Sequence, residues 1–477
     1  MARFGLDEDD LMARAGLAAW RVLLDRWPQA QRIGIVCGPG NNGGDGYVLA
    51  ELARSAGRRV QVMRLSNDVK AGAARRAAEA YLQAAGEAVI FVADDDLPQV
   101  DVWVDALFGI GLKRALDDAA AGVVAALNHQ ASPVLALDVP SGVDADRGHH
   151  HGLAVRANVT LSFMAGKPGL YTGRGRAAAG EVLIDTLGLA DHVFDDLEPA
   201  ARIARPDALP LWLKPRGRNA HKGDFGSMLC IGGDHGFGGA IALCAEAAHR
   251  VGAGLVSAAT RAEHVSMLLT RRPECMARAV DDVDALQPLL DRASVVAIGP
   301  GLGNSEWSAA MLHAALDTPK PRVLDADALN ALARRDPLAL GDAVLTPHPG
   351  EAARLLGCDV AEVERDRLVA ARQLTARYGC VVVLKGAGTV VTAPDEIAVL
   401  IDAGNPGMAS GGMGDVLTGV IAGVIAQGLR PFDAAVCGTL LHAAAGDAAA
   451  RDGGERGLLA SDLFPYLRRL ANPTPHA

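Results

Sequence analysis

The chain has few aromatic residues: Phe, Trp and Tyr together make up only 4% of its 477 positions. Hydrophobic residues nevertheless account for 50% of the chain, so its cores must be built mainly from Ala, Val, Leu and Ile. Together with 55 glycines, this composition is typical of α/β layers joined by tight turns rather than of an aromatic-rich sandwich. At roughly 100–200 residues per domain, the length predicts more than one domain.

A surplus of positive charge is also missing, as is any long apolar stretch. The formal net charge is −10, which excludes the basic surface that nucleic-acid binding requires. Polar residues interrupt every apolar run before it reaches the roughly 20 residues of a membrane span. The N-terminus is acidic from Asp7 to Asp10 and lacks the basic and then apolar pattern of a signal peptide. We therefore expect a cytoplasmic protein that binds neither nucleic acids nor membranes.

The sequence contains no CxxC pair and no Walker A motif, although it has seven cysteines. Cys37 and Cys380 lie in apolar runs, which is typical of buried thiols in a reducing compartment. The run from His149 to His151 has no further ligands at metal-site spacing, so we interpret it as an exposed polar loop. Without a Walker A motif, any phosphate site must be built in another way.

Short apolar runs alternate with alanine-rich helical segments along most of the chain. Nearly all-apolar strands separated by helices predict parallel sheets that are covered on both faces. The expected strands are 32–37, 60–65, 89–92, 102–106, 134–138, 159–163 and 182–185, then 227–231, 254–258, 294–298, 322–325, 343–346, 381–384, 389–392 and 397–401. The main expected helices are 46–56, 71–85, 117–129, 239–251, 360–378, 412–427 and 431–451.

A proline-rich segment separates the two halves of this pattern. Pro199, Pro206, Pro210 and Pro215 prevent regular helix or sheet pairing there. We therefore expect two α/β domains, residues 1–205 and 206–477, each with three α/β/α layers. The two halves share no internal repeat and represent two different domains.

The segment after the first expected strand is dense in glycine and asparagine. It contains Asn41, Asn42, Gly43, Gly44, Asp45 and Gly46. Glycines let successive backbone N–H groups converge, and a helix N-terminus adds positive potential, which together suit a pyrophosphate. The spacing Gly38-x-Gly40-x-x-Gly43 also matches a dinucleotide fingerprint, which is a weak signal alone. A plain strand-to-helix turn capped by Asp45 would need only one or two of these residues, so we favour a binding loop.

Two aspartates end expected strands beside glycine-rich loops. Asp105 is followed by Gly109 and Gly111, and Asp138 is followed by Ser141. In doubly wound sheets, ligands bind outside the carboxyl ends of the strands, so both aspartates point to the crevice of the glycine loop. A single aspartate in such a position would be an ordinary helix cap or turn residue. Two of them, both beside glycine-rich loops, favour a ligand-binding site. Asp138 is the expected acid–base group.

The motifs GPGNNGGDG, DALFGIGL, DVPSGVDAD and GKPGLYTGRG resemble those of the NAD(P)H-hydrate epimerase domain, over about residues 11–189. The resemblance implies a Rossmann-like domain that interconverts the R and S hydrates of NADH and NADPH. It implies that the hydrate is bound by Asn41, Asn42, Gly43, Gly44, Asp45, Gly109, Ile110, Gly111, Leu112, Lys113, Arg114, Ala115 and Asp138. It also implies a potassium ion held by Asn42, Asp105 and Ser141, and such oxygen ligands suit a hard cation.

A second glycine-rich segment opens a long apolar helix. Gly411, Gly412 and Gly414 precede Asp415 at the expected helix start. Backbone N–H groups there suit a phosphoryl group under transfer, and Asp415 can take a proton from an attacking hydroxyl. The helix dipole alone would explain an aspartate in the first turn, but it does not explain the glycines before it.

Further loops follow expected strands in the second half. Gly303 lies in the segment IGPGLG, and Asp325 and Asp327 lie in LDADALN. His348 stands between prolines in LTPHPGE, and Lys385 precedes a glycine turn. A lone His or Lys is more often ordinary surface, but each of these lies in a loop shaped by Gly or Pro. We therefore favour a functional role for them.

The motifs HKGDFGSMLCIGG, IGPGLG, DADALNAL, TPHPGEAARLLG, LKGAGTVV and GNPGMASGGMGDVLTG resemble the ADP/ATP-dependent NAD(P)H-hydrate dehydratase domain, a ribokinase-like fold, over about residues 216–470. The resemblance implies that Ala240, Gly303, His348 and Asp415 contact the hydrate, and that Lys385, Gly386, Ala387, Gly388, Thr389 and Gly414 contact ADP or ATP. Asp415 would activate the hydrate hydroxyl, and Mg²⁺ would bridge the donor phosphates. Asp234 departs from the family, where a serine is usual. The implied whole is a bifunctional metabolite-repair enzyme, isomerase and lyase, acting as a homo-oligomer on small molecules.

Three other functions would account for parts of the sequence. A ribokinase-like kinase of a small alcohol with an N-terminal nucleotide-binding module is the main alternative, and accumulation of a stable phosphate ester would favour it. A non-catalytic nucleotide sensor fits poorly with Asp138 and Asp415 in their loops. An NAD-dependent dehydrogenase would rest on the first glycine loop alone.

Overall fold

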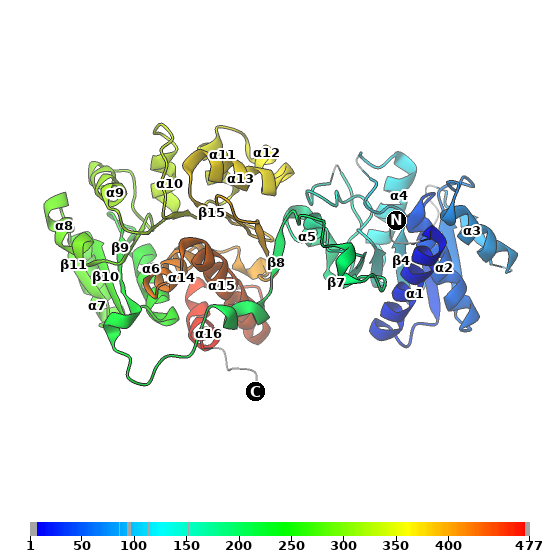
Figure 1. Cartoon of the computed structure of the whole chain (residues 1–477), viewed down its shortest axis with the longest axis horizontal. Helices are drawn as coiled ribbons and strands as arrows, with labels where there is room; N and C mark the ends of the chain where they lie inside the picture. Colours follow the sequence, from blue (N-terminus) through cyan, green and yellow to red (C-terminus); the bar gives the residue numbers. More distant parts are fainter. Residues whose placement is uncertain (1–6, 85, 93–96, 113, 151, 473–477) are drawn as a thin grey trace. The chain divides into compact units, whose positions relative to one another are not determined.

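The computed structural model describes the chain except residues 1–6, 85, 93–96, 113, 151 and 473–477. The chain divides into two compact units, Met1–Glu198 and Pro199–Ala477. Each unit is an α/β fold built around one sheet, as Figure 1 shows. Within the described part of the chain, none of the helices combines the length and apolarity that crossing a bilayer requires.

The described residues of the first unit form one parallel sheet. Its strands are β1 (Arg32–Cys37), β2 (Arg59–Arg64), β3 (Ala88–Ile90), β4 (Val102–Ala106), β5 (Val134–Leu137), β6 (Val159–Phe163) and β7 (Glu181–Asp185). The strand order is β3-β2-β1-β4-β5-β6-β7. The order reverses between β1 and β4, which pair directly, and this is where a doubly wound sheet opens a crevice. The predicted Rossmann-like fold is confirmed.

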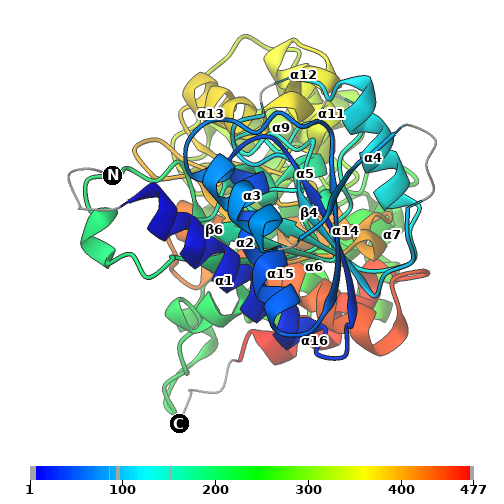
Figure 2. The same cartoon turned by 90° about the vertical axis from the view of Figure 1, so that its right-hand side faces the viewer.

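Helices cover both faces of this sheet. They are α1 (Glu8–Arg26), α2 (Asn41–Ser55), α3 (Ala73–Gln83), α4 (Asp118–Asn128) and α5 (Gly173–Ala179), with short 3₁₀ helices η2 (Pro168–Leu170) and η3 (Asp191–Val193). Figure 2 shows α1, α2 and α3 side by side in front of β4. They pack on the sheet through one apolar core, and α4 packs through a second core around Trp103. Both faces of the strands are thus buried, as the apolar runs predict.

The second unit has a larger sheet with a mostly parallel core. Its strands are β8 (Arg202–Ala204), β9 (Ser227–Ile231), β10 (Leu255–Thr260), β11 (Met276–Ala279), β12 (Val295–Ile298), β13 (Arg322–Leu324), β14 (Ala343–Leu345), β15 (Val381–Leu384), β16 (Val390–Thr392) and β17 (Val399–Ile401). The order is β11-β10-β9-β12-β13-β14-β15-β16-β17-β8. Strands β11 to β15 in that order are parallel, whereas β16 runs antiparallel to both of its neighbours.

Helices again form two layers on the second sheet. They are α6 (Gly238–Val251), α7 (Ala262–Arg271), α8 (Val283–Arg292), α9 (Glu306–Asp317), α10 (Ala326–Leu332), α11 (Pro349–Leu356), α12 (Val360–Arg365), α13 (Arg367–Tyr378), α14 (Met413–Ala426), α15 (Pro431–Gly453) and α16 (Leu463–Leu470), with η4 (Pro206–Leu211), η5 (Lys222–Phe225), η6 (Pro406–Met408) and η7 (Ala460–Asp462). In Figure 1, α6, α14, α15 and α16 lie on one side of the sheet, and α9, α10, α11 and α13 lie on the other. The first layer and the strands share one apolar core.

Several expected elements differ from the structure. Helix α2 begins at Asn41 rather than at the expected Gly46, so the glycine–asparagine segment is the first turn of a helix and not a loop. The expected helix 360–378 is broken at Asp366, whose side chain accepts a hydrogen bond from Val369 N and caps α13. Strands β8 and β11 were not expected, because neither is an apolar run.

The expectations for cysteine and histidine had different outcomes. Cys37 and Cys380 are buried free thiols, as predicted. His149 and His150 are half-buried and their rings stack at 6.4 Å, so this part of the histidine run is not the exposed loop that we expected. His151 lies outside the described residues.

Candidate active sites

The first candidate site lies where β1 passes into α2. A Cβ atom on Gly38 would overlap the Leu107 carbonyl, and one on Gly43 would overlap the Gly38 carbonyl, so only glycine permits this approach of β1, α2 and the loop after β4. Asn41 is exposed, whereas Asn42, Gly43, Gly44 and Asp45 are buried. The first N–H groups of a helix have no intrahelical acceptor. The start of α2 therefore offers donors to an anionic group at the switch point of the sheet.

Further buried polar groups belong to β4, to the loop after β5 and to the first turn of α2. Asp105 is 0% exposed, and its carboxylate accepts hydrogen bonds from Ser141 Oγ at 2.6 Å and Ser141 N at 2.7 Å. Burial raises the pKa of Asp105 to about 6, although the hydrogen bonds from Ser141 oppose the rise. The amide group of Asn42 is buried with neither its oxygen nor its nitrogen hydrogen-bonded. A buried amide without a partner is costly, so a ligand for the Asn42 oxygen is expected here.

The predicted potassium ligands fit this arrangement. Asn42, Asp105 and Ser141 offer amide, carboxylate and hydroxyl oxygens, which a hard monovalent cation accepts. The described residues contain no cluster of three or more His, Cys, Asp or Glu arranged for a metal ion. The orphaned Asn42 amide is the structural observation that favours the cation.

Asp138 follows β5 in a left-handed backbone conformation, with φ 63°. Its Oδ1 accepts a hydrogen bond of 2.6 Å from Lys167 Nζ, and its Oδ2 accepts one of 3.1 Å from Ile110 N. Gly109 is close enough that a Cβ atom there would touch Asp138 Oδ2. Burial and the charge of Asp138 raise the pKa of Asp45 well above its usual value. The site thus joins the start of α2 to the loops after β4 and β5.

The remaining predicted residues of this site have less contact with it. Ile110, Gly111, Arg114 and Ala115 are exposed and Leu112 is half-buried. Lys113 lies outside the described residues. Of the segment from Gly109 to Ala115, the structure brings Gly109 and Ile110 to Asp138. Lys167 was not among the predicted site residues, although its motif was noted.

The second candidate site surrounds the start of α14. Gly412 precedes the helix with φ 88°, a backbone conformation that favours glycine. Asp415 lies in the first turn and is half-buried. Burial and the nearby charge of Asp325 raise the pKa of Asp415 to about 7. A carboxyl group that titrates near neutral pH suits proton transfer.

Lys385 and Asp325 form an ion pair beside Asp415. Lys385 Nζ donates a 2.7 Å hydrogen bond to Asp325 Oδ1, and Thr418 Oγ1 donates a 2.9 Å hydrogen bond to Asp325 Oδ2. Burial opposes the charge of Lys385, but Asp325 and Glu351 outweigh it and raise the lysine pKa. A Cβ atom on Gly414 would lie 3.3 Å from Lys385 Nζ, so the lysine ends at the glycine-rich helix start. Burial raises the pKa of Glu351 to about 7.

His348 and Glu351 cap helix α11 at the same end of the sheet. His348 Nδ1 accepts a 3.0 Å hydrogen bond from Gly350 N, and Glu351 Oε2 accepts a 2.8 Å hydrogen bond from His348 N. Burial and the charge of Lys385 lower the pKa of His348. Because Nδ1 accepts a hydrogen bond, the ring carries a proton on Nε2, which lies 3.3 Å from Glu351 Oε1.

The other predicted residues of this unit lie on adjoining loops. Gly303 N donates a 2.9 Å hydrogen bond to Asp327 Oδ2. A Cβ atom on Gly301 would lie 3.2 Å from the Cβ of Ala240, which places Ala240 beside the IGPGLG loop. The turn after β15 contains exposed Gly386 and Ala387, buried Gly388, and Thr389, whose hydroxyl donates to Gly386 O at 3.1 Å. The sequence analysis did not predict Glu351 or Thr418 as site residues. Glu351 could have been predicted, because it lies three residues after the N-cap residue His348 and forms a capping box with it.

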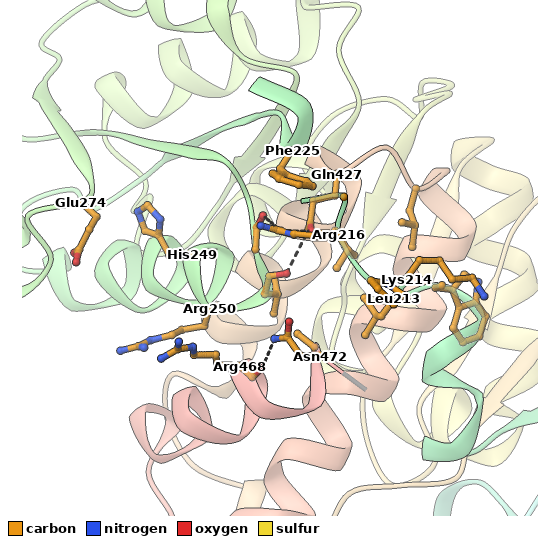
Figure 3. Close-up of a pocket in the computed structure, with 18 of the residues that line it drawn as sticks. Leu213, Lys214, Arg216, Phe225, His249, Arg250, Glu274, Gln427, Arg468 and Asn472 are labelled. Atoms are coloured by element: carbon orange, nitrogen blue, oxygen red, sulfur yellow. Dashed lines mark hydrogen bonds between the residues drawn. The ribbon is translucent and has the colours of Figure 1, made fainter. Parts of the chain in front are cut away.

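A large cavity of about 950 Å³ lies elsewhere in the second unit, at the C-terminal ends of α6 and α14. It contains none of the predicted site residues. Arg216 lines this cavity. Its guanidinium group donates one hydrogen bond to Gly252 O and another, of 2.8 Å, to Gln427 Oε1. Figure 3 shows Arg250 and Arg468 at one side of the view and Lys214 at the other, so these cations do not converge. The interacting charged groups Asp415, Asp325, Lys385 and Glu351 all lie outside this cavity.

Fold and sites together define a two-part α/β enzyme, with a Rossmann-like unit and a ribokinase-like unit. A family model described as NAD(P)H-hydrate dehydratase matches residues 228–469, and one described as YjeF-related protein N-terminus matches residues 8–169. The bifunctional NAD(P)H-hydrate repair enzyme of Coxiella burnetii is 48% identical over 98% of this chain and 96% of its own length. That of Escherichia coli is 47% identical over 98% of this chain and 90% of its own length. The chain belongs to the bifunctional NAD(P)H-hydrate repair enzymes.

A solved structure supports the same conclusion for the second unit. The ADP/ATP-dependent NAD(P)H-hydrate dehydratase of Bacillus subtilis, co-crystallised with ATP/Mg²⁺, is 31% identical. The match has a TM-score of 0.52 and covers 57% of this chain and 97% of that chain. The predicted ribokinase-like fold is therefore confirmed.

Proposed function

We propose that the chain repairs hydrated NADH and NADPH at two separate sites. The N-terminal unit, Met1–Glu198, interconverts the R and S hydrates. The C-terminal unit, Pro199–Ala477, dehydrates the S hydrate with ADP or ATP and releases AMP or ADP and phosphate. The observation that carries the proposal is Asp415, a carboxyl group with a pKa of about 7 at a glycine-rich helix start, beside the Lys385–Asp325 pair.

In the dehydratase site, Asp415 accepts the proton of the hydrate hydroxyl while that oxygen attacks the terminal phosphorus of the nucleotide. The bond to the leaving AMP or ADP breaks, and the N–H groups at the start of α14 stabilise the transferring group. The ring nitrogen lone pair then expels phosphate, and loss of a ring proton restores the double bond. Lys385 and the turn to Thr389 hold the nucleotide. Mg²⁺ would neutralise the donor phosphates when bound.

In the epimerase site, Asp138 exchanges a proton with the hydrated ring. Either the hydroxyl or the ring nitrogen leaves the hydroxyl-bearing carbon, and the same bond then re-forms on the opposite face, which inverts that carbon. The start of α2 and the loop from Gly109 to Ala115 bind the nucleotide. Asn42, Asp105 and Ser141 would hold potassium, which would supply positive charge in the site when bound. The unpartnered Asn42 amide and the buried Asp105 support this assignment.

The cysteines of the chain indicate the cellular compartment in which it acts. Seven free cysteines, most of them buried, favour a reducing compartment such as the cytoplasm. We expect a homo-oligomer with small-molecule substrates, and size-exclusion chromatography with light scattering would test the assembly.

The decisive test supplies mixed R and S hydrates with Mg²⁺, K⁺ and either ADP or ATP, and follows the absorbance of the reduced nicotinamide. We expect complete recovery of both epimers by the intact chain. A stable phosphate ester accumulating in place of reduced nicotinamide would establish the small-alcohol kinase instead. No recovery with either nucleotide would refute the proposal.

A further inference from the structure

The motif GKPGLYTGRG follows β6 and packs beside Asp138. Its lysine, Lys167, donates hydrogen bonds to Asp138 Oδ1 at 2.6 Å and to the Phe163 carbonyl oxygen at 2.7 Å. The side chains of Lys167 and Asp138 are 15% and 14% exposed. Salt screens such a pair far less than a surface pair. The ammonium group thus lies directly against the carboxylate that we assign to proton exchange.

The backbone on the C-terminal side of Lys167 holds this residue in place. Pro168 confines the preceding residue to extended conformations, and Lys167 has φ −100° and ψ 131°. Beyond it, Gly169 N donates to Ala145 O at 2.7 Å, and Gly175 N donates to Gly148 O at 2.7 Å. The motif is therefore bound along its length to the loop after β5, which is the loop that carries Asp138.

Lys167 and the Ile110 backbone together hold the Asp138 carboxylate in one orientation. Oδ1 accepts from Lys167 and Oδ2 accepts from Ile110 N, so the carboxylate plane has one donor at each oxygen. Each oxygen keeps a further lone pair for a substrate. The φ of 63° at Asp138 costs backbone energy, and these contacts offset that cost.

We propose that Lys167 is a positioning residue of the epimerase site, whose ammonium group orients the Asp138 carboxylate and balances its charge during proton exchange. The inference rests on the proposed epimerase function. The proton passes between the substrate and Asp138, and Lys167 keeps its own protons throughout.

The test compares Lys167→Met, which removes the charge at similar length, with Lys167→Arg, which keeps it. Arg26→Met is the matched control, because Arg26 also pairs with a carboxylate, Glu181, at the far end of the sheet where β7 begins. Starting from the pure R hydrate, NMR follows the appearance of the S hydrate. The thermal unfolding of each variant is measured in parallel.

We expect Lys167→Met to lower the epimerisation kcat by about tenfold to a hundredfold, with KM changed by less than about threefold, since a positioning loss acts on the chemical step. Lys167→Arg should recover part of kcat, and Arg26→Met should match the wild type. An unchanged kcat in Lys167→Met, or an equal loss in Lys167→Arg, would overturn the inference. Absence of epimerisation by the wild type would instead refute the proposed function.

Discussion

Lys385 Nζ lies 2.7 Å from Asp325 Oδ1, and both groups are charged at the start of the helix that carries Asp415. Burial opposes the charge of Asp325, but Lys385 outweighs it and lowers the pKa of that carboxyl. The charge that remains on Asp325 adds to burial in raising the pKa of Asp415 to about 7. Asp325 thus stays ionised, while the raised pKa of Asp415 suits proton transfer near neutral pH. Pairs of carboxyl groups with such different pKa values are common in active sites.

The two sites should be separable by single substitutions. Asp415→Asn removes the proton acceptor and should lower the dehydration rate by about 10²–10⁴-fold, with epimerisation unchanged. Asp138→Asn should have the reverse effect. Dehydration of pure S hydrate with ADP and interconversion of pure R hydrate are measured separately. Loss of both activities in either variant would contradict the independence of the sites.

Dehydration should fall as the solution becomes acidic. Asp415 must be ionised to accept a proton, and its pKa is about 7, so kcat/KM should decline below that pH. Lys385 lowers this pKa, so Lys385→Met should move the decline to higher pH. The profile is measured on the S hydrate with saturating nucleotide and Mg²⁺. A decline only at about pH 4, the value of an ordinary aspartate, would show that Asp415 is not the base.

Potassium should stabilise the N-terminal unit. An ion bound at 100 times its Kd adds about 2.7 kcal/mol to the free energy of unfolding. The unfolding transition of this unit should therefore be higher in KCl than in choline chloride at equal ionic strength. Asn42→Ala should remove the difference. Equal transitions of the wild type in both salts would exclude the site.

Helix packing behind Asp415 should be sensitive to one methyl group. A Cβ atom on Gly419 of α14 would overlap the Cys244 carbonyl oxygen of α6, so Gly419→Ala forces the helices apart. We expect a loss of about 1–3 kcal/mol in urea unfolding. Gly453, the last residue of α15, has open space around its Cβ position, so Gly453→Ala should be neutral or stabilise by up to about 1 kcal/mol. Equal effects of the two variants would show that close packing at Gly419 is not needed.

The strand pattern was predictable because most strands are short apolar runs buried on both faces. Burial of this kind leaves a signal in the sequence itself, and β1, β4, β6, β9 and β15 occupy the ranges that we expected. β11 has only one buried residue and shows no such run. The start of α2 was misplaced because asparagine and glycine have low helix propensity. The close approach of Gly38, Gly43 and Leu107 overrides that preference.

By itself, the sequence determined the two-domain α/β organisation and the positions of Asp138 and Asp415, because apolar strands and glycine-rich turns are local patterns. Only the tertiary structure decided how the charges pair. Asp138 and Lys167 are 29 residues apart, and Asp325 and Lys385 are 60 apart, yet each pair is joined by a hydrogen bond. The physical reason is that ion pairing and burial depend on which strand ends meet at one edge of a sheet, a long-range property that no local pattern of residues encodes.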